Sequence, residues 1–443
     1  MTTSRLAATG VALALLLTLG ACASKSNDDA PSNASHIEGT VPLTVQDRAT
    51  WKSQIMDGAP VQVTSLGVLT FSADKSVDGK RYAPVLLHPK DGSARWVGEA
   101  IESGSMPTLE WVQEGERRWA VAKTVEGNKV SLHAWNGLAS RSESKVTSSK
   151  VFEGKKNPPN VVFSGTGVLV TGADKTAAEP LVFWPKDASI TRYKGGPKRG
   201  GEAGAPIGVY GGGFLVSFKG GGFSFASPTG GWSSTSVVPE GANPQTGAVL
   251  KQGNGYIISE WERSSGQKDG ATILAVHSAT SGHLFAQYDV PEDEADILAT
   301  QKESGAALVT DGSQWLAWGQ FSFNFDTGEG SLCDLKQGVP TAIIDGLLYV
   351  RDARSLIGQD ETTASASPQP SVGGSAEPSD GGSGESTIDP GAPQGFAGVA
   401  GLDLATGQPL SGLPSMYPIG RTSTGQVILR DDAKRTIYSV GIR

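Results

Sequence analysis

A short turn motif recurs along most of this 443-residue chain and constrains its fold more than any other feature. In its best copy, Gly401–Leu410, an apolar stretch leads into Asp403, Thr406 and Gly407, and a second strand can then begin. An Asp-Gly, Asn-Gly or Thr-Gly step supplies the positive φ that a hairpin turn needs. Weaker copies lie at Leu87–Ser93, Leu132–Gly137, Phe183–Ala188, Ala226–Gly230, Val276–Gly282 and Asn324–Gly328.

The spacing of these turns predicts a repeated four-stranded unit. Apart from one longer interval they lie roughly 42 to 52 residues apart, and a period of about 45 residues is typical of a β-propeller blade. A second pattern, usually Gly before an apolar run, occurs eight times and is expected in strands near the axis, because neighbouring blades cover such strands on both sides. It begins at Gly67, Trp119, Gly167, Gly213, Gly255, Trp315, Gly346 and Gly425.

The sequence therefore predicts an all-β fold, an eight-bladed β-propeller, with seven blades as the alternative. The sequence has eight apolar runs but only seven turn motifs, so the last blade lacks one strand. The chain ends at Ile437–Ile442, where an outer strand should follow, and Val41–Gln46 alternates like a strand without a partner. Pro42 suits an edge position. We expect the N-terminal strand to complete the last blade and close the ring.

One interval breaks the period, because Gly328 and Gly407 are 79 residues apart. The surplus matches residues 360–394, which are rich in Ser, Pro, Gly and acidic residues and contain no Trp, Tyr, Phe, Leu or Lys. Such a segment cannot bury enough surface to offset its ordering entropy. The sequence predicts a disordered insertion within a β-propeller that spans residues 37–443.

The N-terminal residues 1–21 have the pattern of an export signal. Arg5 precedes an uncharged apolar run from Leu6 to Leu19, which is too short to span a bilayer comfortably. Leu19-Gly20-Ala21-Cys22 resembles the lipobox of bacterial lipoproteins, and this resemblance implies that Cys22 is lipidated and becomes the mature N-terminus. An ordinary signal peptide is the alternative. Residues 22–36 are polar and predict a flexible tether.

Charge and cysteine content narrow the possible partners. The chain carries 37 basic and 45 acidic residues; without Arg5 of the signal the balance is 36 against 45, or −9. An acidic surface repels phosphate backbones, so nucleic-acid binding is not expected. With Cys22 lipidated, Cys333 has no partner for a disulfide and is predicted to be a small buried strand residue.

The motif Leu402–Leu410 resembles the repeat of PQQ-like propellers, a family that includes quinone-dependent alcohol dehydrogenases and the propeller lipoprotein of the outer-membrane barrel-assembly machinery. The resemblance implies an eight-bladed ring over residues 41–443. The dehydrogenases hold their cofactor with an adjacent-cysteine disulfide, and Cys333 is the only cysteine left in the body. Because one fold hosts both enzymes and binding proteins, the repeat alone does not carry the chemistry.

Several residues are candidates for a site, and each of them also has a structural role that it could play. His88, His133 and His277 share a repeat position, but blades would hold them apart, so turn or packing roles are expected rather than a metal site. Glu292–Asp296 is expected to be a solvated connector, with weak calcium binding as the alternative. Trp111, Trp135 and Trp261 lie near strand ends and are candidates for a binding face, although packing between blades is the commoner role of Trp here.

These observations lead to a functional hypothesis without a catalytic site, cofactor or metal. We expect a monomeric, membrane-anchored, extracytoplasmic lipoprotein whose propeller is a binding or scaffold module for another protein of the cell envelope. A small-molecule or glycan-binding lipoprotein is the first alternative, and a quinone-type dehydrogenase is the second.

Overall fold

The computed structural model describes residues 35–39, 41–42, 44–73, 80–114, 117–137, 148–173, 179–264, 272–333, 335, 338–352, 401–410 and 416–443. Strands dominate these ranges, and α1 (Ala295–Glu303) is their only α-helix. Two short 3-10 helices cover Ser234–Ser236 and Glu292–Glu294. The expected all-β class is therefore confirmed. No helix in the described ranges is long and apolar enough to cross a membrane.

Most strands belong to eight four-stranded antiparallel meanders, which we call sheets 1 to 8 in chain order. Sheet 1 contains β3 (Gln62–Thr64), β4 (Gly67–Phe71), β6 (Pro84–Leu87) and β7 (Ala94–Val97). Sheet 2 contains β9 (Thr108–Glu114), β10 (Arg117–Glu126), β11 (Lys129–Asn136) and β12 (Ser148–Glu153). Sheet 3 contains β13 (Asn160–Ser164), β14 (Gly167–Thr171), β15 (Leu181–Trp184) and β16 (Ser189–Arg192). Sheet 4 contains β19 (Ala205–Tyr210), β20 (Gly213–Ser217), β21 (Phe223–Ser227) and β22 (Gly230–Ser233).

The second half of the chain repeats the same meander. Sheet 5 contains β23 (Ala248–Gly253), β24 (Tyr256–Glu262), β25 (Thr272–Ser278) and β26 (Leu284–Val290). Sheet 6 contains β27 (Leu308–Thr310), β28 (Trp315–Trp318), β29 (Phe321–Asn324) and β30 (Glu329–Leu332). Sheet 7 contains β31 (Gly338–Ile344), β32 (Leu347–Asp352), β33 (Gly401–Asp403) and β34 (Pro409–Leu410). Sheet 8 contains β35 (Tyr417–Arg421), β36 (Val427–Asp431), β37 (Thr436–Ile442) and β2 (Val45–Gln54), with β1 (Ser35–His36) at its edge.

Three further pairings complete the strand inventory. A parallel pair between Gln287 of β26 and Glu329 of β30 joins sheets 5 and 6 into one eight-stranded sheet. The two-stranded pairs are β5 (Arg81–Tyr82) with β8 (Ile101–Glu102), and β17 (Lys198–Arg199) with β18 (Glu202–Ala203).

Hydrophobic clusters join the sheets face to face in chain order. Each cluster draws its residues from two consecutive sheets, as Leu69 and Trp135 do for sheets 1 and 2. The cluster that contains Val68, Ile428 and Ile437 joins sheet 8 to sheet 1. The apolar contacts therefore pass through all eight sheets and return to the first. Burial of both faces explains why the strands in the middle of each sheet are apolar along their whole length.

The eight apolar runs occupy the second strand of each sheet. They form β4, β10, β14, β20, β24, β28, β32 and β36. The first strand of each sheet has one free edge, and side chains of neighbouring sheets bind part of it. For example, Ser164 Oγ accepts the Val209 amide at 2.9 Å. Second strands are paired on both edges and covered on both faces, which is the physical reason for their apolar runs.

The repeated turn motif forms hairpin turns, as the sequence predicts, and in the structure it lies between the third and fourth strands of the sheets. Gly92, Gly282, Gly328 and Gly407 adopt φ values of 69°, 73°, 76° and 68°. In the best copy, the Asp403 carboxylate accepts the amides of Ala405 and Thr406 at 2.9 and 3.1 Å. The side chain thus fixes the turn locally. The copy at Asn136-Gly137 differs, because it ends β11 and its connection to β12 includes residues outside the described ranges.

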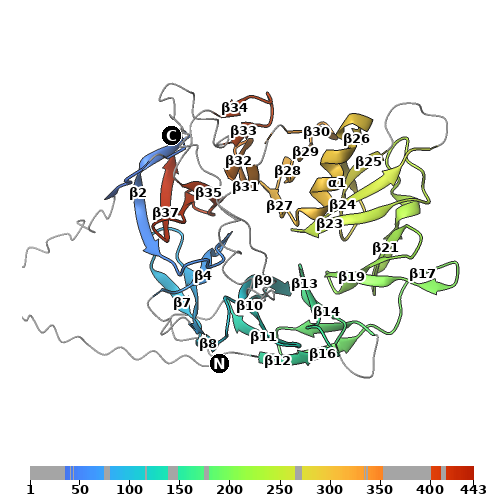
Figure 1. Ribbon diagram of the computed structural model, residues 1–443, viewed down its shortest axis with the longest axis horizontal. Helices are drawn as coiled ribbons and strands as arrows, with labels where there is room; N and C mark the ends of the chain where they lie inside the picture. Colours follow the sequence, from blue (N-terminus) through green and yellow to red (C-terminus); the bar gives the residue numbers. More distant parts are fainter. Residues whose placement is uncertain are drawn as a thin grey trace, which may run out of the picture. The chain divides into compact units, whose positions relative to one another are not determined.

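The N-terminal strand pairs with the C-terminal strand. Figure 1 shows the blue β2 beside the red β37, with pairs from Val45–Ile442 to Gln54–Thr436. The sequence places this strand at Val41–Gln46, whereas it covers Val45–Gln54 in the structure, so the expected position is wrong by several residues. Pro42 cannot donate to a ladder, and its carbonyl instead accepts the Val45 amide at 3.2 Å in a turn.

Several predictions concern residues outside the described ranges. The signal at 1–21, the lipidation site Cys22 and the insertion at 360–394 belong to this group. At the start of the folded body, Ser35 and His36 already pair with Ala49 and Arg48. Ordered pairing therefore begins two residues before the expected boundary at 37.

Candidate functional site

The first strands of five sheets line a cavity among the described residues. Its volume is about 870 Å³, and its walls come from β3, β9, β27, β31 and β35, with Asn254 from the end of β23. Four of these strands, β9, β27, β31 and β35, are labelled in Figure 1. Cavities of this size accommodate small organic ligands.

Charged side chains gather where three of the first strands end. Arg421 is the last residue of β35, and its Nη1 donates to Oδ1 of Asp345, just after β31, at 2.6 Å. Asp311 follows β27, and its Oδ1 accepts the amides of Ser313, Gln314 and Trp315 at 2.9, 2.9 and 3.0 Å. All three charged residues line the cavity. The ion pair is about half exposed, so its main effect is to hold neighbouring strand ends together.

Glu110 lies farther along the cavity wall, in the middle of β9. Burial raises the pKa of its carboxyl group, while the Gln62 amide and the charge of Lys123 oppose this rise. Gln62 Nε2 donates to Oε2 of Glu110, and it also donates to the Leu109 carbonyl at 3.2 Å. Gln62 Oε1 accepts the Trp111 amide at 3.3 Å. The amide of Gln62 is therefore fixed against β9 and holds the carboxyl group of Glu110 in place.

The cavity lining combines three carboxylates and one guanidinium with uncharged polar and aliphatic residues. Within the described residues it includes no His, Cys or Lys, the side chains that usually form nucleophile–base pairs. The described ranges also contain no group of three His, Cys, Asp or Glu residues that could hold a metal ion. Polar side chains such as Gln62, Thr310, Gln314 and Thr341 instead offer hydrogen bonds.

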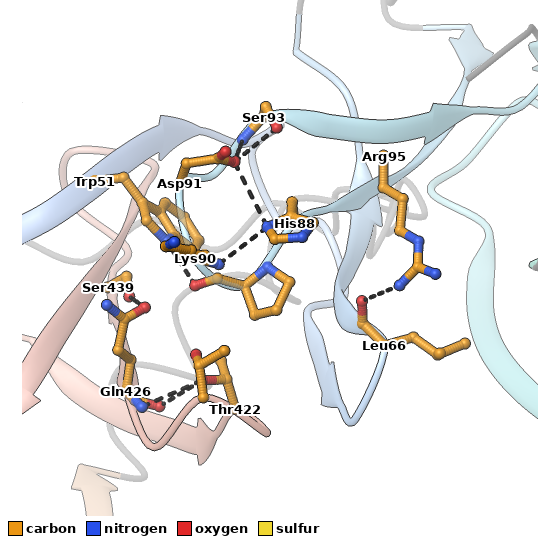
Figure 2. Close-up of polar contacts among 12 residues, drawn as sticks. Trp51, Leu66, His88, Lys90, Asp91, Ser93, Arg95, Thr422, Gln426 and Ser439 are labelled. Atoms are coloured by element: carbon orange, nitrogen blue, oxygen red, sulfur yellow. Dashed lines mark hydrogen bonds and ion pairs between the residues drawn. The ribbon is translucent and has the colours of Figure 1, made fainter. Parts of the chain in front are cut away.

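The three histidines at one repeat position lie in three different sheets. His88 precedes the β6–β7 turn, where its Nδ1 accepts the Lys90 amide at 3.2 Å and lies 3.7 Å from Oδ1 of Asp91 (Figure 2). His133 lies on β11, where burial lowers its pKa. His277 is fully buried on β25 beside Phe223 and Trp261. The structure therefore does not bring these residues together.

Figure 2 also shows how sheets 8 and 1 meet around this turn. Trp51 of β2 donates from Nε1 to the Pro89 carbonyl at 3.0 Å. Arg95 of β7 donates to the Leu66 carbonyl at 3.2 Å, and Ser439 of β37 donates to Gln426 at 2.8 Å. Of these three contacts, the Trp51 bond joins sheet 8 to sheet 1, whereas the Arg95 bond lies within sheet 1 and the Ser439 bond lies within sheet 8.

The tryptophan candidates divide into core and cavity residues. Trp135 and Trp261 are fully buried between sheets, so both have the packing role that is the commoner expectation for Trp here and neither lines a binding face. Trp111 is half-buried and lines the cavity. Large aromatic rings fill the space between twisted sheets, where glycines make room for them; a Cβ on Gly247 would lie 2.7 Å from the Trp261 ring.

Two other predictions concern single segments. Glu292–Asp296 connects sheets 5 and 6 as expected, but it forms a 3-10 helix and the start of α1, and Glu294 Oε2 accepts the Tyr288 hydroxyl at 2.7 Å. Cys333 is buried, as expected, one residue after β30. The Cys333 thiol donates to Ser322 Oγ at 3.2 Å. Burial raises the pKa of this thiol, so Cys333 is an unreactive core residue.

Gln62 and Glu110 are cavity residues that the sequence patterns do not reveal. Neither belongs to a motif, and they are 48 positions apart. One signal was present: Glu110 is a charged residue inside the otherwise apolar run Leu109-Glu110-Trp111-Val112. A carboxylate in such a run must face an opening or a partner, because unpaired burial of a charge is costly.

No protein-family model matches this chain, and no curated protein matches it. Solved structures with a weak similarity include the mitotic checkpoint complex, with 8% identity, coverage of 100% of this chain and 99% of the other, and a TM-score of 0.31. An uncharacterized protein from Listeria monocytogenes EGD-e has 6% identity, coverage of 71% and 92%, and a TM-score of 0.37. Dihydro-heme d1 dehydrogenase NirN in complex with DHE has 12% identity, coverage of 69% and 65%, and a TM-score of 0.31.

Proposed function

We propose that this chain is a non-catalytic, lipid-anchored extracytoplasmic binding protein that takes a small polar solute into the cavity between its first strands. In this proposal the eight sheets are the blades of a PQQ-like β-propeller, β2 completes the last blade, and the molecule is a monomer tethered through Cys22. The closed circuit of contacts between the sheets supports the blade assignment. The resemblance of the turn motif to the PQQ-like repeat supports the type of propeller.

The cavity is the observation that carries the function. It offers about 870 Å³ and a lining of aliphatic residues, one half-buried tryptophan, and amide, hydroxyl, carboxylate and guanidinium side chains. Binding sites for small solutes combine a formed cavity with a few placed polar groups. A lining without His, Cys or Lys among the described residues gives no support to an enzyme.

The surface gives less support to the expected protein scaffold. Docking faces need a buried apolar centre. In the described ranges, only Val125 and Val151 are large hydrophobic side chains with clear exposure, at 40% and 57%. Val125 pairs with Val130 in sheet 2, and Val151 pairs with the adjacent Ser131, so the two valines lie on opposite faces of that sheet. They therefore do not form a patch.

A solute screen that compares the wild type with a variant whose cavity is filled tests this proposal. Thermal shift and calorimetry on the mature protein would use neutral sugars, sugar acids, amino acids and amines. Thr341→Trp fills the cavity wall, and Thr229→Trp, in the exposed β21–β22 turn, is the matched control. We expect at least one solute class to bind the wild type and the control but not Thr341→Trp.

Two outcomes would contradict the proposal. Saturable binding of pyrroloquinoline quinone with calcium, together with dye-linked dehydrogenase turnover, would identify an enzyme. If crosslinking in intact cells traps a specific envelope protein and no solute binds in the screen, the protein-scaffold function is supported instead.

A further inference from the structure

One carboxylate oxygen in the cavity lacks a partner. Oε2 of Glu110 accepts a hydrogen bond from Gln62, whereas Oε1 has no hydrogen-bond partner among the described residues. Gln62 cannot supply a second bond, because its Nε2 donates to both Glu110 and the Leu109 carbonyl. A carboxylate has about four acceptor positions, so this one keeps most of its capacity for a ligand.

The environment of Glu110 disfavours its charge in the absence of a ligand. Burial in the cavity wall raises the pKa of the carboxyl group, and the Gln62 amide offsets this only in part. Lys123, on β10, opposes the rise through its charge but makes no ion pair with Glu110 in the structure. A positive group placed at Oε1 would compensate for the lost hydration directly.

The other charged groups of the lining are already satisfied. Asp345 is bound to Arg421 at 2.6 Å, and Oδ1 of Asp311 accepts three backbone amides. The described lining thus contains three carboxylates and one guanidinium, which leaves a net charge of −2 if all are ionised. Glu110 is the one of these carboxylates that has neither an ion-pair partner nor a set of backbone donors.

We propose that the solute is an organic cation, whose ammonium group binds Oε1 of Glu110 while its remaining polar atoms contact the amide and hydroxyl side chains of the cavity wall. This inference rests on the proposed function, since it names the class of solute for the same cavity. Gln62 is a positioning residue that holds the carboxylate toward the incoming charge. Anionic solutes are excluded from this position by the charge of the lining.

Matched pairs of probes test the class of solute. Glucosamine is compared with glucose, and 1,6-diaminohexane with 1,6-hexanediol, by calorimetry on the mature protein at pH 7.5. We expect each amine to bind at least tenfold more tightly than its neutral partner. Glu110→Gln keeps the shape but removes the charge, and it should abolish this preference. The control Glu202→Gln, on exposed β18, should keep it.

The outcomes separate the two proposals. Equal binding of amines and neutral partners to the wild type would overturn the cationic class but leave the solute-binding function intact. No binding of any probe, together with no hit in the broader solute screen, would overturn both. If Glu110→Gln fails to fold by circular dichroism, Glu110→Asp takes its place, and it should weaken amine binding while leaving glucose and hexanediol unchanged.

Discussion

At the scale of single residues, His277 shows how a repeat position becomes part of the core. Its side chain is 0% exposed, neither ring nitrogen has a hydrogen-bond partner, and burial lowers its pKa to about 4. The Gly282 backbone opposes only part of this shift. The unfolded chain has the ordinary pKa of about 6.5 for this side chain. His277 is thus neutral in the folded protein at pH values at which the unfolded chain binds a proton.

This difference predicts a loss of stability in acid. Above pH ~6.5 both states are neutral and the full stability is present; as the pH falls toward 4, only the unfolded state gains the proton. The loss is about 3 kcal/mol at the lower limit. His277→Leu should flatten the dependence of the unfolding free energy on pH between 7 and 4.5, measured by urea denaturation. A wild-type slope in His277→Leu would contradict the assignment.

At the scale of elements, β2 connects the two ends of the described chain. Its ladder with β37 spans Val45–Gln54, so most of the pairing lies beyond Val41–Gln46, the segment in which the sequence predicts a strand. Trp51 is the main side chain of this strand in the cluster between sheets 8 and 1, and it is 3% exposed. A Cβ on Gly92 would lie 2.6 Å from its ring, which explains why the turn beneath it contains glycine.

Removing the Trp51 side chain should therefore weaken the junction of sheets 8 and 1. We expect Trp51→Ala to lower the free energy of unfolding by about 3–5 kcal/mol, since it leaves a cavity and an unpaired Pro89 carbonyl. Lys52→Ala, at the neighbouring exposed position, should change it by less than about 0.5 kcal/mol. Guanidinium denaturation monitored by circular dichroism measures both. A Trp51→Ala midpoint equal to that of the wild type would show that β2 does not hold this junction.

At the scale of the whole molecule, attachment to a membrane is a prediction from sequence. The lipobox-like Leu19–Cys22 implies acylation at Cys22, and lipid chains then provide the anchor. Cys22→Ala should leave the precursor unprocessed or release the protein from membranes, as measured by fractionation and intact-mass analysis. Cys333→Ala, which alters only a buried thiol, is the control and should stay membrane-bound. An unmodified mature N-terminus at another residue would argue for an ordinary signal peptide.

The sequence by itself determined the local features of this protein. Turn chemistry acts over a few residues, so the hairpins around Gly328 and Gly407 could be placed, and apolar runs such as Gly67–Phe71 identified buried strands. The burial of Cys333 followed from the same pattern. These features repeat along the chain and together predict the all-β class and the period of its sheets.

Tertiary structure alone decided the features that depend on distant residues. The partner of β2 lies almost 400 positions away, at Val45–Ile442, and no local signal specifies where that ladder begins. Gln62 meets Glu110 only because sheets 1 and 2 pack together, and Trp261 is buried because Gly247 leaves space for its ring. A cavity is a product of packing between sheets, so its residues share a location and a chemistry but no spacing in the sequence.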